Sequence, residues 1–174
     1  MGTAVRRAGS VLAAGALLLA LAAGVALAAD FVGNSGPNTL VGTASADAID
    51  GRGGNDTLDG LGGNDSILGD HGDDLILGGP GGDDPGFDVG PGARRGLNGG
   101  PGEDRIEGNG GDDFLVGAAG GDLLLGGAGD DRIGDPGPGA VDLIRCGEGV
   151  DFVEASPDDR VAADCERVER PEVS

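Results

Sequence analysis

The 174-residue chain has no lysine, tryptophan or tyrosine, a single histidine and only two cysteines. Aromatic residues make up 2% of it, which excludes a conventional packed core. With so few nitrogen and sulfur ligands, zinc and copper are poor candidates for a bound metal. The sequence also has no nucleophile elbow and no HExxH motif. We interpret His71 as an exposed turn residue, and we predict that the protein is not an enzyme.

The chain is instead rich in glycine, with 40 residues, and it repeats every nine residues. Residues 51–59 read GRGGNDTLD and residues 60–68 read GLGGNDSIL, so the pattern is G-x-x-G-x-D-x-U-x with U apolar. A fixed period this short predicts stacked turns of a solenoid. The regular units begin at Gly33, Gly42, Gly51, Gly60, Gly69 and Gly78, and again at Gly99, Gly108, Gly117 and Gly126.

The two blocks of units are separated by residues 87–98, which hold three extra residues and a degraded unit, GPGARRGLN. Two weaker units begin at Gly137 and Cys146. The eighth position of the units is aliphatic except at Pro85, and it predicts a thin inner row of side chains. Its members are Leu40, Ile49, Leu58, Ile67, Ile76, Pro85, Leu97, Ile106, Leu115, Leu124, Ile133, Ile144 and Val153.

The sixth position is acidic in almost every unit, which predicts columns of carboxylates that need cations. Ca²⁺ suits such columns because it takes six to eight oxygen ligands in flexible geometry, whereas Mg²⁺ demands stricter octahedral geometry. Glycines allow the backbone to turn its carbonyl groups toward one point. The predicted metal ligands are Asp47, Asp56, Asp65, Asp74, Asp83, Asp104, Asp113, Asp122 and Asp131, with Asn38, Asp142 and Asp151 as secondary candidates.

These units resemble the RTX, or haemolysin-type, calcium-binding repeat GGxGxDxUx, strongly over residues 33–134 and weakly over 137–154. The resemblance implies an all-β fold, a parallel β-roll in which two units complete one coil. It also implies several Ca²⁺ ions between the turns of neighbouring coils, held by the aspartates and by backbone carbonyls.

Two units per coil predict which aspartates share an edge of the roll. If the degraded unit counts as half a coil, Asn38, Asp56 and Asp74 share one edge with Asp113 and Asp131. Asp47, Asp65 and Asp83 then share the other edge with Asp104 and Asp122. Arg95 would fall between Asp74 and Asp113, where its guanidinium could replace a calcium ion. The alternative is that residues 84–98 form a surface loop that interrupts the roll.

The charge of the chain also indicates cations as partners. After residue 29 it carries nine arginines and all 31 acids, a formal charge of −22. Without counter-ions, self-repulsion should keep such a chain expanded. One buried aliphatic side chain contributes about 1.5–3 kcal/mol, which cannot offset the ordering of nine residues at roughly 1–2 kcal/mol each. Metal binding should therefore supply much of the folding free energy, and neither nucleic acid nor an anionic membrane is expected to bind.

The N-terminus is predicted to be a signal peptide, residues 1–28. Two arginines precede an apolar run from Val11 to Leu27, and Ala26-Leu27-Ala28 fits a small-x-small cleavage site. The alternative is an uncleaved membrane anchor. We therefore predict secretion to the extracellular space, with no membrane contact once the signal is cleaved.

Cys146 and Cys165 are predicted to form a disulfide that staples a C-terminal cap, with two free thiols as the alternative. The predicted organisation is a signal peptide (1–28), a β-roll (29–136, interrupted around 84–98) and weak repeats with a cap and tail (137–174). The predicted function is a secreted, non-catalytic calcium-binding protein that folds on binding Ca²⁺. An extracellular adhesin or surface-binding module with a cell-surface or matrix partner, and an accessory subunit of a secreted enzyme, are the alternatives.

Overall fold

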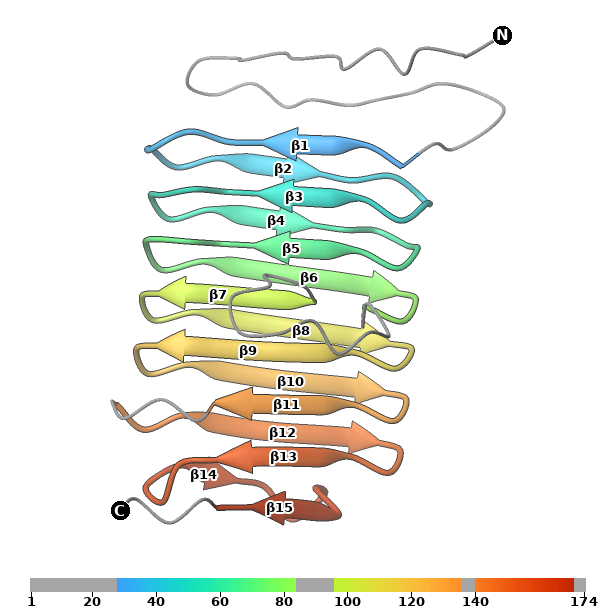
Figure 1. The fold of residues 1–174 in the computed structure, drawn as a ribbon, viewed down its shortest axis with the longest axis vertical. Helices are drawn as coiled ribbons and strands as arrows, with labels where there is room; N and C mark the ends of the chain where they lie inside the picture. The colour runs from blue at the N-terminus through green and yellow to red at the C-terminus, as the bar shows by residue number, and fades with distance from the viewer. Residues whose placement is uncertain (1–27, 84–95, 136–139, 171–174) are drawn as a thin grey trace, which may run out of the picture.

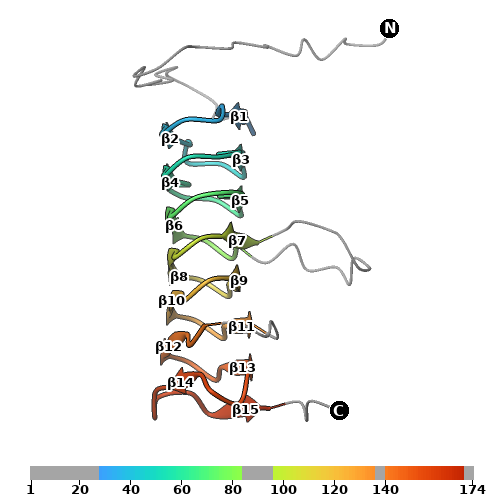
Figure 2. The same ribbon diagram turned by 90° about the vertical axis from the view of Figure 1, so that its left-hand side faces the viewer.

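The computed structural model describes residues 28–83, 96–135 and 140–170. In these residues the chain winds into a parallel β-solenoid, with strands stacked as rungs along its long axis (Figure 1). Seen from the side, the solenoid is a narrow slab of two facing sheets (Figure 2). The described part of the chain contains no helix long and apolar enough to cross a membrane. The predicted signal peptide lies outside the described residues, apart from Ala28.

Successive strands alternate between the two sheets, and every strand pairs in parallel with the strand one coil away. One sheet, in order, consists of β1 (Asp30–Val32), β3 (Ala48–Asp50), β5 (Ser66–Leu68), β7 (Leu97–Pro101), β9 (Phe114–Ala119), β11 (Arg132–Asp135), β13 (Phe152–Ala155) and β15 (Arg167–Glu169). The other consists of β2 (Thr39–Val41), β4 (Thr57–Asp59), β6 (Leu75–Pro80), β8 (Arg105–Gly110), β10 (Leu123–Ala128), β12 (Leu143–Glu148) and β14 (Arg160–Val161). The predicted all-β, parallel β-roll fold is confirmed.

The core is the predicted row of single side chains, one from each strand triplet. Because alternate residues of a strand point to opposite faces, only the middle residue of x-U-x turns inward. Leu58, Ile76 and Leu124 are fully buried, for example, and Leu40 is partly buried at the N-terminal end. Phe31 in β1 adds a rung that the repeat pattern did not predict. A core this thin gives each coil little apolar area to bury.

The pairing of β7 shows which strand follows β6 after the interruption of the repeat. This strand directly follows β6 in the solenoid, and Leu97 pairs with Ile67 on one side and Leu115 on the other. Leu97 therefore occupies the rung that the nine-residue count assigned to Pro85, which lies outside the described residues. Proline cannot donate a ladder hydrogen bond, so a leucine triplet is the better strand at this central place.

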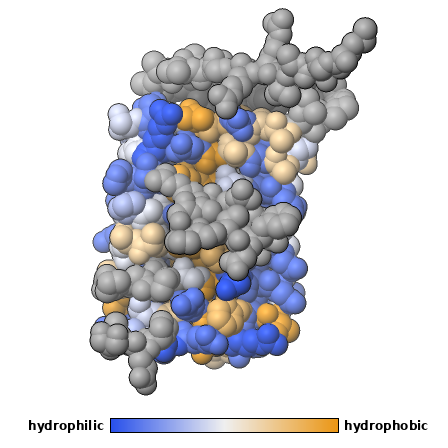
Figure 3. All heavy atoms as spheres, viewed as in Figure 1, coloured by the Kyte–Doolittle hydropathy of each residue, from blue (hydrophilic) through white to orange (hydrophobic). Residues whose placement is uncertain are grey.

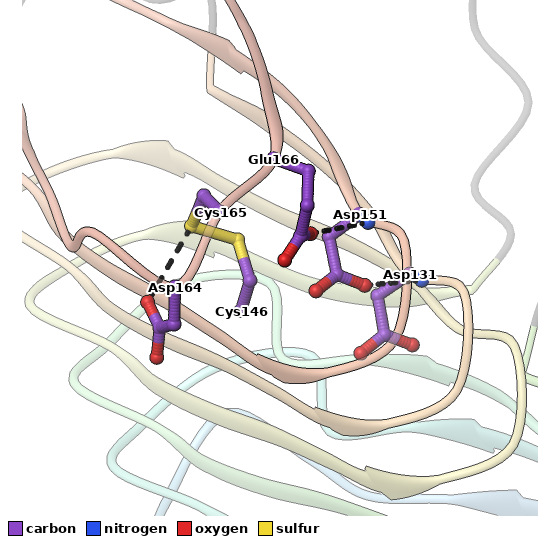
Figure 4. The surroundings of a disulfide bond; sticks show 6 residues. All are labelled: Asp131, Cys146, Asp151, Asp164, Cys165 and Glu166. Atoms are coloured by element: carbon purple, nitrogen blue, oxygen red, sulfur yellow. Dashed lines mark hydrogen bonds between the residues drawn. A yellow bond between two sulfur atoms is a disulfide. The ribbon is translucent and has the colours of Figure 1, made fainter.

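The C-terminal segment continues both sheets rather than departing from them. β13 pairs with β11, and β14 pairs with β12. The predicted Cys146–Cys165 disulfide is confirmed, with a Cα–Cα distance of 5.2 Å. It ties β12 to the connection between β14 and β15, close to the end of one column of acids (Figure 4).

Removing this disulfide should destabilise the last coils. In the chain-entropy model a loop of this length contributes about 3 kcal/mol. We expect the double variant Cys146→Ala, Cys165→Ala to unfold at a clearly lower urea concentration in saturating calcium. The wild-type protein with a reducing agent is the control, and its unfolding curve should match that of the variant. An unchanged midpoint in both samples would contradict this prediction.

Candidate metal centre

The sixth-position residues form two columns, one along each long edge of the solenoid. Apart from Asp83, each aspartate directly precedes a strand, so one column lies at the start of the even-numbered strands and the other at the start of the odd-numbered strands (Figure 1). The Asp74 column contains Asn38, Asp56, Asp74, Asp104, Asp122, Asp142 and Asp159. The Asp83 column contains Asp47, Asp65, Asp83, Asp113, Asp131 and Asp151, and Glu166 closes it.

One part of the predicted edge assignment is wrong. The backbone N–H of Asp74 donates to Oδ1 of Asp104 at 2.8 Å, and that of Asp83 donates to Oδ1 of Asp113 at 2.8 Å. Beyond the interruption, the predicted members of the two edges are therefore exchanged. The assumption that the degraded unit forms half a coil fails, because β7 follows β6 directly. The proposed stand-in residue, Arg95, lies outside the described residues.

Each column is held together by one hydrogen bond per coil. The backbone N–H of a sixth-position residue donates to Oδ1 of its counterpart in the next coil, over 2.7–3.1 Å. Glu166 accepts the last such bond of the Asp83 column from the N–H of Asp151, as Figure 4 shows. The repeat pattern does not predict Asp159 and Glu166 as members of the columns, because they lie outside the nine-residue register.

In most of the column aspartates, the second carboxylate oxygen, Oδ2, differs from Oδ1 in its hydrogen bonding. The aspartate side chains of both columns are nearly inaccessible to solvent; Asp83, for example, is 1% exposed. Within the described chain, eight of the buried Oδ2 atoms have no hydrogen-bond partner. They belong to Asp56, Asp65, Asp74, Asp83, Asp104, Asp122, Asp131 and Asp151. A buried carboxylate oxygen without a partner is costly, so these atoms call for a cation or a proton.

Burial also changes the acidity of these groups. Desolvation raises the pKa of Asp83, Asp104 and Asp131 to about 7, partly offset by the backbone hydrogen bond to each carboxylate and reinforced by neighbouring carboxylates. The same causes raise the pKa of Asp56, Asp65 and Asp122 to about 6. The columns therefore hold protons near neutral pH when no cation is present.

Backbone carbonyl groups supply further oxygens at the same places. A Cβ added to Gly60 would lie 2.3 Å from Oδ2 of Asp65 and 2.6 Å from the carbonyl oxygen of Gly78 in the next coil. The same arrangement recurs at Gly69, which faces Asp74 and Gly99. In these units the opening glycine thus leaves room for a carboxylate oxygen and a carbonyl oxygen to approach one another.

The donor set suits a hard cation. Among the described residues, no group of three or more His, Cys, Asp or Glu side chains converges on one point. The oxygens that lie close together at these turns come from a carboxylate and a backbone carbonyl, as at Gly60. Ca²⁺ accepts that mixture of oxygens in irregular geometry, whereas structural zinc sites are built mainly from cysteine and histidine.

The outer surface agrees with this placement. Hydrophilic residues gather along both edges of the face in view in Figure 3, with apolar residues between them. Fifth-position acids such as Asp73, Asp112 and Asp130 are exposed beside the buried columns. Both edges of the solenoid are therefore strongly negative, which favours the approach of cations.

A two-sheet parallel solenoid with one carboxylate per half-coil defines the class: a β-roll of nonapeptide repeats. A family model described as RTX calcium-binding nonapeptide repeat (4 copies) matches residues 32–67, 50–84 and 97–133. The chain belongs to this family, whose repeats bind calcium. No curated protein and no solved structure gives a match to the chain.

Proposed function

We propose that this protein is an exported, non-catalytic calcium-binding protein whose β-roll forms when Ca²⁺ occupies the two columns. The observation that carries the proposal is the row of buried Oδ2 atoms that lack a hydrogen-bond partner within the described coils. Ca²⁺ would satisfy these oxygens and neutralise the charge that neighbouring coils bring together. The ligands would be the column aspartates of the family's repeats together with carbonyls of the glycine-rich turns.

Coupling of folding to calcium follows from the balance of forces in one coil. Two aliphatic side chains are the only core that most coils contribute, while two carboxylates per coil are buried. Burial of unpaired charge opposes folding more strongly than this core favours it. A cation that binds only the folded roll shifts the balance toward the roll by mass action. Because neighbouring coils share the columns, we expect cooperative binding.

Export is proposed on two observations. The N-terminal segment has the charge, apolar run and cleavage site of a secretory signal. A disulfide near the C-terminus suits an oxidising compartment. Outside the cell the repeats would meet calcium at millimolar concentration, the range in which extracellular calcium modules bind, with Kd about 10⁻⁴–10⁻³ M. The roll would then form after export.

The test is a far-UV circular dichroism titration of the purified chain with calcium, with magnesium as the control metal. We expect a cooperative transition from coil to β-structure with calcium alone. A β spectrum that is the same in EDTA and in calcium would overturn the coupling of folding to calcium. Equilibrium dialysis of the same samples would measure the bound ions directly, and an absence of bound calcium would overturn the binding itself.

A matched pair of variants tests the site. Asp74→Asn keeps an oxygen that can accept the hydrogen bond from Asp56 but removes the buried charge. Asp73→Asn makes the same charge change at the adjacent, exposed position. We expect the first variant to need roughly ten times more calcium for half-saturation, and the second to change little. Equal effects in both variants would mean that net charge, and not the column, determines affinity.

A further inference from the structure

Within the described residues, the turns of the nine-residue units are of two kinds, which differ in the backbone conformation of their second residue. In the turns whose Oδ2 atoms lack a partner, the second residue has a left-handed backbone. It is a glycine at Gly79, Gly100, Gly127 and Gly147, with φ between 103° and 122°. It is a residue with a side chain at Arg52, Leu61, Asp70 and Ala118, with φ between 70° and 83°. We call these the open turns.

The left-handed backbone is costly for a residue with a Cβ atom. The strain is roughly 1–2 kcal/mol per residue, and it recurs here in several coils. Such strain persists where the surrounding structure requires that conformation. All the open turns adopt this conformation, whatever the identity of their second residue.

The first two turns, Gly33–Asn38 and Gly42–Asp47, are built differently, and we call them the closed turns. Their second residues, Asn34 and Thr43, do not have a positive φ. The backbone N–H of Asn34 donates to Oδ1 of Asn38 at 2.8 Å, and that of Thr43 donates to Oδ2 of Asp47 at 2.6 Å. The sixth-position side chain of each closed turn is thus bonded within its own turn.

The side chains at the second position also accept hydrogen bonds within the closed turns. Oδ1 of Asn34 accepts the N–H of Gly36 at 2.9 Å, and Oγ1 of Thr43 accepts the N–H of Ser45 at 3.2 Å. In the open turns the corresponding N–H donates instead to a carbonyl of the next coil, as from Gly63 to Pro80 at 3.1 Å. Asparagine and threonine are residues that form such local turns.

Both carboxylate oxygens of Asp47 consequently accept hydrogen bonds from the protein. Its Oδ1 accepts the N–H of Ala29 at 2.7 Å. Its Oδ2 accepts both the N–H and the hydroxyl of Thr43, at 2.6 and 2.9 Å. Asn38, the corresponding residue of the other column, is uncharged.

At the C-terminal end, Asp159 is engaged in a similar way. Its Oδ1 accepts the N–H of Asp142 at 3.1 Å, and its Oδ2 accepts the N–H of Ser156 at 2.6 Å. Residues with both carboxylate oxygens bonded to the protein itself therefore lie at both ends of the solenoid, and the open turns lie between them.

We infer that the two closed turns hold no calcium and serve as a metal-independent N-terminal cap, so that the calcium columns begin one coil later, at Asp56 and Asp65. The inference rests on the proposed function. It replaces Asp47 and Asn38 as predicted ligands by a capping role. Calcium binding at Oδ2 of Asp47 would compete with the two hydrogen bonds that this oxygen accepts from Thr43, whereas at Asp65 it satisfies an Oδ2 that accepts none.

The test compares Asp47→Ala with Asp65→Ala, two residues of the same column in adjacent coils. Bound calcium per chain is measured by equilibrium dialysis at saturating calcium, beside the wild-type protein. We expect Asp65→Ala to lose at least one ion and Asp47→Ala to bind as many ions as the wild type. Loss of calcium from Asp47→Ala equal to the loss from Asp65→Ala would overturn the inference. This outcome is distinct from failure of the proposed function, in which the wild type itself binds no calcium.

A second variant decides the matter if Asp47→Ala does not fold. Thr43→Gly removes the hydroxyl that bonds Ser45 and Asp47, and it removes the β-branched side chain that opposes a positive φ. We expect this turn then to open and the chain to bind at least one more ion than the wild type. An unchanged number of ions would mean that the second position does not govern calcium binding, and the inference would fall.

Discussion

A single methyl group at Gly120 should disrupt the solenoid. A Cβ atom there would lie 1.5 Å from the carbonyl oxygen of Gly102 in the preceding coil, and the backbone of Gly120 has φ 150°. The clash is with main chain, so no side chain can turn aside to relieve it. Strain and overpacking together should cost Gly120→Ala roughly 3 kcal/mol or more of the free energy of unfolding. Urea unfolding in saturating calcium measures this loss.

Gly110→Ala is the matched control for this substitution. Gly110 is the last residue of β8 and also lies in the glycine-rich part of its unit, but a Cβ atom there would come no closer than 3.8 Å to the carbonyl oxygen of Ala128. Its φ lies outside the left-handed region. We expect its stability to stay within about 1 kcal/mol of the wild type, because replacing glycine where the backbone permits it mainly restricts the unfolded chain. Equal stability of the two variants would refute the close stacking of turns along the column edges.

The contrast between these two glycines shows what a repeat pattern can and cannot predict. The nine-residue period predicts the inner row of aliphatic side chains and the two columns, because each depends only on a position within the unit. It does not say which glycines face the neighbouring coil. That distinction depends on how closely consecutive turns stack, which only the three-dimensional arrangement reveals.

The register across the interruption shows a second limit. Two triplets, at Pro85 and at Leu97, compete for one place in the sheet, and counting in nines cannot choose between them. Packing and hydrogen bonding favour Leu97, which is fully buried between Ile67 and Leu115. The proline at the centre of a strand triplet was the available signal, since a central strand disfavours proline.

The closed turns were also readable in part. Thr43 stands where other units have glycine, arginine, leucine, alanine, aspartate or asparagine. Threonine forms local turns with its own backbone, so a different turn at Thr43 could have been predicted. Asn34 gives no such signal, because Asn109 at the same position has φ 76°. The hydrogen bond to Oδ2 of Asp47 could not be predicted, because it depends on the direction of the backbone N–H of Thr43.

The metal-free protein should respond to pH in the direction opposite to the calcium-loaded protein. Burial raises the pKa of Asp83, Asp104 and Asp131 from 3.8 to about 7 in the folded, metal-free chain. The folded chain therefore binds more protons than the unfolded chain between about pH 4 and pH 7. Protonation stabilises the metal-free roll, and this stabilisation is complete below about pH 4 and is lost as the pH rises through 7. In EDTA we expect more β-structure at pH 5 than at pH 8, measured by circular dichroism.

Calcium binding should follow the reverse trend, because the ion and the protons compete for the same oxygens. Below about pH 7, we expect the calcium concentration at half-saturation to rise about tenfold for each unit by which the pH falls, for each proton that the ion must displace. The triple variant Asp83→Asn, Asp104→Asn, Asp131→Asn removes three of the titrating groups, and we expect it to lose much of the pH dependence in EDTA. The exposed set Glu103→Gln, Asp112→Asn, Asp130→Asn changes the net charge equally and should keep that dependence. If the exposed set abolished it instead, the response would arise from overall charge repulsion and not from the buried columns.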